Sequence, residues 1–246
     1  MVDFLSVRTS VHSQKRTDSG HCNKPAAGPQ QLGIKADRRS ALLALGLMWA
    51  GGTGLVRAEP GRAGVLVVGD SLSAEYGLPR GSGWVALLQH KLSAEPARPS
   101  VVNASISGDT SSGGRSRLAA LLRQHKPRVL IIELGGNDAL RGLPLNMTED
   151  NLRAMVQAGK QAGARVLLLG MQMPPNYGAK YSADFAAVYS RVAKDSQSGL
   201  VPFFLKGVAD RPDPTEWFQA DRIHPNEQAQ QRMLDNVWPE LKKLLK

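Results

Sequence analysis

The sequence has little cysteine, few aromatic residues and no long apolar run. Its one cysteine, Cys22, cannot pair within the chain, so a fold built on internal disulfides is excluded. No group of cysteine and histidine residues has the spacing of a metal site, and we expect neither a zinc fold nor a bound metal or cofactor. No apolar run reaches the length of about 20 residues that a spanning helix needs, which excludes a multi-pass membrane protein.

The net charge of +10 is typical of a nucleic-acid-binding protein, but part of it lies near the N-terminus. The first 58 residues hold 8 of the 31 Lys and Arg residues and 3 of the 21 Asp and Glu residues. In residues 59–246 the basic residues are scattered along the sequence. They form no basic stripe, and aromatic residues, 5% of the chain, form no series that could stack on bases. We therefore expect no nucleic-acid partner.

Residues 1–58 have the charge and hydropathy order of an export signal. Arg38 and Arg39 precede the short apolar stretch 41–56, and small residues around Ala58 suit cleavage by a signal peptidase. The apolar stretch is interrupted by glycines and a threonine, so we expect no stable membrane span. The paired arginines also resemble a twin-arginine signal.

This pattern predicts an N-terminal extension and one mature domain. Residues 1–37 are polar and without periodicity, which indicates disorder. We expect residues 59–246 to form the mature domain and the protein to be periplasmic or secreted. The alternative interpretation of 41–56 is an amphipathic helix packed on the domain.

From Gly64 onward, short apolar runs alternate with segments of helical periodicity. The apolar runs are typical of buried strands, expected at 65–68, 101–102, 129–134, 166–169 and 200–204. Ser82 and Thr148 are expected to cap two of the intervening helices, and the last helix is expected from about Pro225. Strands that alternate with helices require a parallel sheet covered on both faces. We predict a single α/β domain with a doubly wound, five-stranded parallel sheet.

Polar and glycine residues follow three of these strands, at the edge where doubly wound sheets form their sites. Ser71, in the segment 69–73, comes directly after the first strand. Gly108 follows the second strand, and the third leads into Gly135-Gly136-Asn137-Asp138. Ser71 can project a hydroxyl into the crevice, and Gly108 and Asn137 can offer N–H donors. Each segment taken alone is equally explained as a turn.

Asp221 and His224 lie three residues apart in a loop before the last helix. At this spacing the carboxylate can hold the imidazole Nδ1–H, which leaves Nε2 to accept a serine proton. His224 alone could equally cap the helix. Taken together with the strand-end residues, the pair completes a set of nucleophile, base, orienting acid and oxyanion donors.

These four segments resemble the GDSL or SGNH hydrolases, among them the bacterial thioesterase I, arylesterase and lysophospholipase group. The resemblance extends over about residues 64–240. It implies the flavodoxin-like SGNH hydrolase fold and a serine hydrolase that cleaves carboxylic ester or thioester bonds through an acyl-enzyme. The implied partners are small acyl esters or thioesters, lysophospholipids among them.

The resemblance also assigns roles to single residues. It implies that Ser71 is the nucleophile, that His224 is the general base and later the acid, and that Asp221 orients the imidazole. The backbone N–H groups of Ser71 and Gly108, with the side-chain amide of Asn137, are implied to form the oxyanion hole. Asp70, Asp109 and Asp138 carry no implied chemistry and are interpreted as acceptors that organise the loops.

The loop after the fourth strand is a candidate acyl-binding segment. It holds Met173, Pro174 and Tyr177, and the flexible methionine suits a pocket that accepts several chain lengths. The alternative is that Met171 and Met173 fill core beneath the loop. Glu75 departs from the family pattern by placing a charge near the nucleophile.

Two other functions fit parts of the pattern. A carbohydrate O-deacetylase or acyltransferase can use the same triad, with the same chemistry at Ser71. A flavodoxin-like binding protein can cradle a phosphate in the glycine-rich loop 108–114, although such a loop is expected after the first strand.

Overall fold

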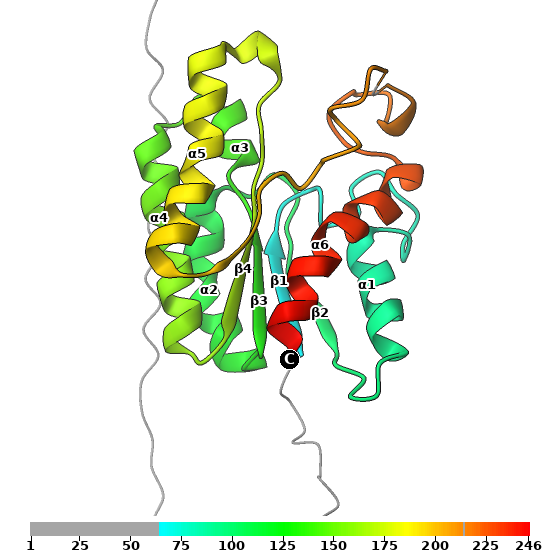
Figure 1. The fold of residues 1–246 in the computed structure, drawn as a ribbon, viewed down its shortest axis with the longest axis vertical. Helices are drawn as coiled ribbons and strands as arrows, with labels where there is room; N and C mark the ends of the chain where they lie inside the picture. Colours follow the sequence, from blue (N-terminus) through cyan, green and yellow to red (C-terminus); the bar gives the residue numbers. More distant parts are fainter. Residues whose placement is uncertain (1–63, 214) are drawn as a thin grey trace, which may run out of the picture. The chain divides into compact units, whose positions relative to one another are not determined.

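The computed structural model describes residues 64–213 and 215–246. The expected extension and export signal, residues 1–58, lie outside the described residues. Figure 1 shows the described part as a central sheet with helices on both faces. No helix within this part of the chain is long and apolar enough to cross a membrane.

The five strands are parallel and lie in the order β2-β1-β3-β4-β5. Their bounds are β1 Val65–Gly69, β2 Val101–Asn103, β3 Val129–Glu133, β4 Arg165–Leu169 and β5 Gly199–Val201. In the register, Val67 is the partner of both Asn103 on β2 and Ile131 on β3. The chain moves from β1 outward to β2 and then crosses back to β3. The strand order therefore reverses between β1 and β3, which is where such sheets open a crevice.

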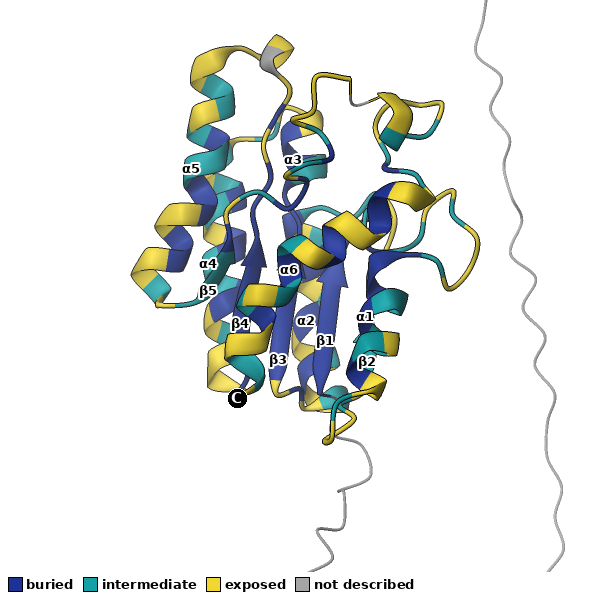
Figure 2. Cartoon of the chain, turned by 45° about the vertical axis from the view of Figure 1, so that its right-hand side comes forward, coloured by how far each residue is buried: buried dark blue, intermediate teal, exposed yellow. Residues whose placement is uncertain are grey.

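Apolar side chains explain why these segments form the centre of the sheet. Every residue of β1 and of β3 is buried, and Val65 to Val68 are fully inaccessible. β-branched residues dominate both strands and suit a pleated surface that is covered on each side. Figure 2 shows these buried strands enclosed by helices with exposed outer faces. The predicted doubly wound sheet is confirmed.

The long helices form two groups, one on each face of the sheet (Figure 1). The first group is α1 Trp84–Ser93 and α6 Gln230–Leu245, and the second is α2 Ser111–His125, α4 Leu145–Gln161 and α5 Ala179–Ser196. The short helix α3 Gly136–Leu140 follows β3, and 3-10 turns occupy Pro175–Tyr177, Thr215–Trp217 and Glu227–Ala229. Helical spacing of apolar residues gives each long helix a buried stripe, as in α4.

The two predicted helix caps were wrong. Gly83, not Ser82, precedes α1, and the Ser82 hydroxyl donates to the carbonyl of Pro79 instead. α4 begins after Pro144, four residues earlier than expected, so Thr148 lies within the helix, where its hydroxyl donates to Asp138 (3.2 Å). Pro144 suits this start because proline lacks the N–H that a helix leaves unpaired there.

Two expected boundaries also moved. The fifth strand is Gly199–Val201, so residues 202–204 continue as loop rather than strand. The last helix, α6, begins at Gln230 and follows a separate 3-10 turn capped by Asn226.

Candidate active site

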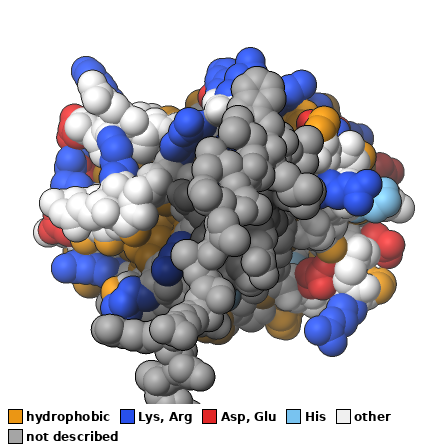
Figure 3. Space-filling model, turned by 90° about the horizontal axis from the view of Figure 1, so that it is seen from below, with side chains coloured by type: hydrophobic (Ala, Val, Ile, Leu, Met, Phe, Trp, Pro, Cys, Tyr) orange, Lys and Arg blue, Asp and Glu red, His pale blue; other side chains and the backbone are white. Residues whose placement is uncertain are grey.

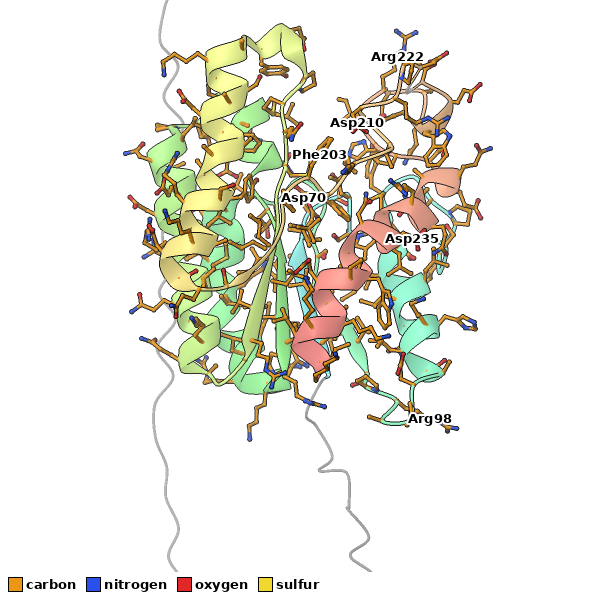
Figure 4. The ribbon with its side chains drawn as sticks, viewed as in Figure 1. Asp70, Arg98, Phe203, Asp210, Arg222 and Asp235 are labelled. Atoms are coloured by element: carbon orange, nitrogen blue, oxygen red, sulfur yellow. The ribbon has the colours of Figure 1, made fainter. Side chains whose placement is uncertain are left out.

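Ser71 stands at the carboxyl end of β1, beside the point where the strand order reverses. The chain turns sharply there, because the carbonyl of Asp70 accepts the N–H groups of Ser73 (3.2 Å) and Ala74 (3.0 Å). Ser71 is half-buried in this turn. Figure 4 places Asp70, its chain neighbour, at the upper end of the sheet.

The structure brings the three predicted triad residues together. His224 Nε2 lies 2.9 Å from Ser71 Oγ, and His224 Nδ1 lies 2.7 Å from Asp221 Oδ2. The two contacts use opposite ring nitrogens, so a proton on Nδ1 leaves Nε2 as an acceptor towards the serine. This hydrogen-bonded chain is the arrangement that lets an imidazole take a proton from a hydroxyl.

The backbone around Asp221 keeps its carboxylate in position. Asp221 Oδ1 accepts the N–H groups of Ile223 (2.9 Å) and His224 (3.0 Å), while Oδ2 faces the imidazole. Burial raises the pKa of Asp221, but the hydrogen bonds from the His224 side chain and these N–H groups outweigh it and lower that pKa to about 2. The carboxylate is therefore ionised across the neutral range.

The loop that carries the pair is closed by its own hydrogen bonds. Gln219 N donates to the His224 carbonyl (2.8 Å), and Asn226 N donates to the Trp217 carbonyl (2.9 Å). The Gln219 side chain also donates to the carbonyl of Tyr76 (2.8 Å), which joins this loop to the segment after β1. The base and the nucleophile thus come from loops that are tied to each other.

The Tyr76 ring packs against the imidazole of His224. The ring centroids are 4.4 Å apart with an interplanar angle of 40°. Tyr76 is itself 50% exposed, whereas the His224 side chain that its ring packs against is 18% exposed. A role for Tyr76 in the site was not predicted from the sequence, although the residue lies five positions after Ser71.

The residues expected to form an oxyanion hole lie at the ends of β1, β2 and β3. Gly108 has a φ of 77°, a conformation that favours glycine, and its carbonyl accepts from Arg141 (2.8 Å). Within the described residues, no acceptor is bonded to the backbone N–H of Ser71 or of Gly108. Asn137 lies in the first turn of α3, and its Nδ2 donates to Asp70 Oδ2 (3.0 Å).

A buried pair of carboxyl groups supports this edge of the site. Glu133 is fully buried, and its Oε2 accepts from Asp70 N (3.2 Å) and from the Ser73 hydroxyl (2.8 Å). Desolvation raises the pKa of Glu133 well above its usual value, and the neighbouring Asp70 charge raises it further. Desolvation also raises the pKa of Asp70, to about 6. The pair therefore holds a proton that isolated carboxylates would release.

Glu133 was missed by the sequence analysis, which took it as one more residue of an apolar strand. The available signal was a carboxylate at the end of a run that is otherwise apolar. Such a residue has to find polar partners when the strand is buried.

The aspartates interpreted as loop acceptors have that role. Asp109 accepts from Thr110 N (3.0 Å) and pairs with Arg117 (2.8 Å). Asp138 accepts from Ser111 N (2.8 Å) and from the Ser111 hydroxyl. Asp70 accepts from Leu72 N (3.0 Å).

These bonds bear on the phosphate-cradle alternative. In loop 108–114 the N–H groups of Thr110, Ser111 and Gly113 are all taken, the last by the Thr110 hydroxyl (3.2 Å). A phosphate cradle needs such groups unpaired, so the flavodoxin-like binding interpretation is not supported.

Glu75 does not add its charge to the reacting centre. Its carboxylate accepts the N–H groups of Gly81 (3.1 Å) and Gly83 (2.9 Å), which organises the loop ahead of α1.

The predicted acyl-binding residues lie on the loop between β4 and α5. Met173 is 8% exposed and belongs to the core, whereas Tyr177 is 40% exposed and Pro174 is also exposed. The alternative interpretation of Met171 and Met173 as core residues is therefore the better one. Tyr177 remains available to a substrate.

A hydrogen-bonded Ser–His–Asp chain at the switch point of a doubly wound sheet is the site of a serine hydrolase. Comparison with known proteins agrees. Residues 67–232 match the family described as GDSL-like Lipase/Acylhydrolase family. The chain belongs to this family of ester hydrolases, and the resemblance seen in the sequence is confirmed.

Several relatives are similar over most of their length. The chain is 54% identical to "Esterase TesA" of Pseudomonas aeruginosa over 181 residues, which are 74% of this chain and 89% of the relative. It is 45% identical to "Thioesterase 1/protease 1/lysophospholipase L1" of Escherichia coli K12, again over 74% of this chain and covering 84% of that protein.

A solved structure of TesA superimposes with a TM-score of 0.70 at 54% identity, covering 73% of this chain and 98% of that one. The psychrotrophic esterase EstA from Pseudoalteromonas sp. gives a TM-score of 0.69 at 41% identity, covering 74% of this chain and 97% of that one. The shared fold is therefore that of SGNH hydrolases.

Proposed function

We propose that the protein hydrolyses carboxylic esters and thioesters of acyl chains through an acyl-enzyme on Ser71. The observation that carries this proposal is the chain of contacts from Asp221 through His224 to Ser71, at 2.7 and 2.9 Å. The names of the relatives, which include an esterase and a thioesterase, support the same substrate class.

In the first half of the reaction, Ser71 Oγ attacks the acyl carbonyl carbon while its proton passes to His224 Nε2. The bond from the carbonyl carbon to the alcohol oxygen or thiol sulfur then breaks, and the leaving group takes that proton. In the second half, water attacks the acyl-enzyme, His224 removes a water proton, and the proton returns to Oγ as the acid leaves. Asp221 stays ionised throughout and stabilises the imidazolium.

Negative charge develops on the carbonyl oxygen in both halves. The backbone N–H groups of Ser71 and Gly108 and the amide of Asn137 donate to it. The two backbone donors suit this role because no described residue accepts from them. Asn137 keeps its orientation through the bond to Asp70 and has a second amide proton for the substrate.

The test is hydrolysis of matched esters and thioesters by the parent protein and by Ser71→Ala. We expect the variant to lose several orders of magnitude in kcat with an unchanged melting temperature, because one oxygen is removed from a half-buried turn. Asn137→Ala is expected to raise the barrier by about 2.7–4 kcal/mol. Normal turnover by Ser71→Ala would contradict the proposal.

Within this substrate class we propose that the protein also cleaves lysophospholipids, which carry an acyl ester on an amphiphilic leaving group. The experiment is a side-by-side rate profile with a lysophospholipid, an acyl-CoA, an aryl ester and an acetylated sugar, with Ser71→Ala as the blank. We expect the three acyl substrates to be cleaved faster than the sugar. The reverse order would favour the carbohydrate O-deacetylase alternative.

We also propose that residues 1–58 export the protein to the periplasm or beyond. The support is the order of Arg38, Arg39, the apolar stretch 41–56 and the small residues at 58. Mass spectrometry of the protein from a bacterial host should find a mature chain that begins near Glu59. An intact N-terminus on cytoplasmic protein would contradict this. Replacing both arginines by lysine should block export only on the twin-arginine route.

A further inference from the structure

Positive charge gathers at the edge of the sheet opposite the active site. This amino edge is formed by the ends of five helices and the connections that follow them, namely residues 91–100, 123–128, 160–165, 194–199 and 242–246. It holds eleven of the 22 Lys and Arg residues of residues 64–246 but two of their 17 Asp and Glu residues. The fold therefore collects at one edge basic residues that are scattered along the sequence.

The charges of the amino edge are largely unneutralised. Among the described residues, Lys243 is the one cation of this edge with a carboxylate within 4.0 Å, that of Glu240. Asp195, one of the two carboxylates of the edge, pairs with Arg153 outside it. Figure 3 looks onto this side of the molecule and shows Lys and Arg side chains around its rim. In Figure 4, Arg98 marks this edge and Arg222 the opposite one.

An apolar hollow opens within the same edge. Leu92, Pro99, Trp238 and Leu245 line it, while three cations, Arg128, Lys242 and Lys246, and one carboxylate, Glu95, contribute charged groups. Lys91 lies over the Trp238 ring, with Nζ 4.7 Å from the centroid. An apolar floor whose border carries more cations than carboxylates suits an amphiphile with an anionic head group better than it suits a polyanion such as nucleic acid.

We propose that the amino edge is a docking surface for an anionic lipid bilayer. Lysine and arginine side chains bind the phosphate groups of the head groups, and the hollow beside Trp238 receives apolar atoms of the lipid. Docking in this way leaves the Ser71 crevice facing the aqueous side, because it lies at the other end of every strand.

The experiment compares sedimentation of the full chain with two kinds of vesicle, phosphatidylcholine alone and phosphatidylcholine mixed with phosphatidylglycerol. Binding to the neutral vesicles measures adsorption that does not depend on lipid charge, so the excess on anionic vesicles measures the contribution of the amino edge. The test variant carries Arg123→Glu, Lys194→Glu and Lys242→Glu, three exposed side chains of this edge. The control carries Arg80→Glu, Lys180→Glu and Lys206→Glu, which are exposed at the opposite edge and change the net charge equally.

We expect the parent and the control to prefer anionic vesicles at low salt and to lose that preference at high salt. The test variant should lose at least about 100-fold in the partition coefficient, since each cation near an anionic surface contributes about fivefold. Circular dichroism checks that both variants are folded. If a Glu variant is unfolded, the same three positions are changed to Gln instead.

Three results would overturn the proposal. They are a parent without preference for anionic vesicles, an equal loss in both variants, and displacement of the vesicles by a duplex DNA oligonucleotide at matched phosphate. The first result would show that the protein does not recognise anionic lipid. The second would show that binding depends on net charge and not on the amino edge. The third would assign the surface to nucleic acid. None of these readouts uses ester hydrolysis, so a failure of this proposal is distinguishable from a failure of the proposed function.

Discussion

The side-chain amide of Asn137 donates to the carboxylate of Asp70, the residue immediately before Ser71, at 3.0 Å. One carboxylate oxygen serves this bond, and the other accepts Leu72 N at 3.0 Å. Asp70 is 3% exposed, so water does not compete for either bond. A single buried carboxylate thus connects the turn that carries Ser71 to the amide expected to stabilise the oxyanion.

The first prediction follows from this pair of acceptors. Asp70→Asn can accept on one side-chain atom only, so it has to give up either the Asn137 bond or the Leu72 bond. We expect kcat to fall about 10- to 100-fold with little change in KM, less than the loss for a missing oxyanion donor. If Asp70 acts through Asn137, adding Asp70→Asn to Asn137→Ala should cost almost nothing more. If the fold-loss in kcat of the double variant equals the product of the two single losses, the two residues act independently, which would contradict the positioning role.

The second prediction concerns the acid of the triad. Asp221→Asn keeps an oxygen for the N–H groups of Ile223 and His224 but turns an NH₂ group towards Nδ1. The imidazole is then held with its proton on Nε2, where it cannot accept the serine proton. We expect kcat to fall by a factor of about 10⁴ while the melting temperature changes little. Equal turnover would show that the acid is not needed to set the tautomer.

The fold was predictable from the sequence where burial alone decides the local structure. The first, third and fourth strands are short apolar runs, and each was found within one residue of its expected bounds. Ser71, Gly108 and Asn137 were identified because parallel strands all end at one edge. Asp221 and His224 were identified by their spacing in a loop, and the roles of all five residues came from the resemblance to the SGNH hydrolases.

Features that depend on contacts between distant residues were not predictable. Thr148 is a residue suited to capping, but its hydroxyl bonds to Asp138 in the preceding helix. Ser82 is equally suited, but its hydroxyl bonds within a local turn, to the carbonyl of Pro79. Glu133 gave no periodic signal, because a buried carboxyl group is explained only by the partners around it. The amino edge was invisible for the same reason, since its eleven cations come from five separate segments.

The third prediction is a pH dependence of stability that originates in Asp70 and Glu133. Burial raises the pKa of both groups in the folded protein, that of Asp70 from 3.8 to about 6. The folded state therefore binds protons more tightly than the unfolded state, and stability falls as the pH rises from about 4 to 6 and beyond. Asp221 has the opposite shift, to about 2, so its contribution grows up to about pH 5 and does not mask the fall above that pH.

Urea unfolding across this pH range measures the effect. Each pH unit within the window lowers the free energy of unfolding by up to about 1.4 kcal/mol per proton released. Glu133→Gln keeps an oxygen for Asp70 N and Ser73 but carries no proton to lose, so its decline should be shallower. The same slope in the parent and the variant would place the titrating group elsewhere.

The fourth prediction concerns Tyr76, whose ring lies 4.4 Å from the imidazole of His224. An aromatic face stabilises the imidazolium that forms when His224 takes the serine proton. We expect Tyr76→Ala to lower kcat about two- to fivefold, with Tyr76→Phe close to the parent because the ring remains. Loss of activity in Tyr76→Phe would instead assign the effect to the hydroxyl.

The fifth prediction concerns acyl-chain length and the loop between β4 and α5. Tyr177 is the aromatic residue of this loop and is 40% exposed, whereas Met173 is 8% exposed and part of the core. Tyr177→Ser therefore removes apolar surface from the loop without opening the interior. Each methylene of an acyl chain that packs on this surface contributes about 0.8 kcal/mol, so long chains depend on it more than short ones. We expect kcat/KM for dodecanoyl esters to fall about tenfold relative to that for acetyl esters, which serve as the internal control. An equal loss for both esters would show that the loop does not select chain length.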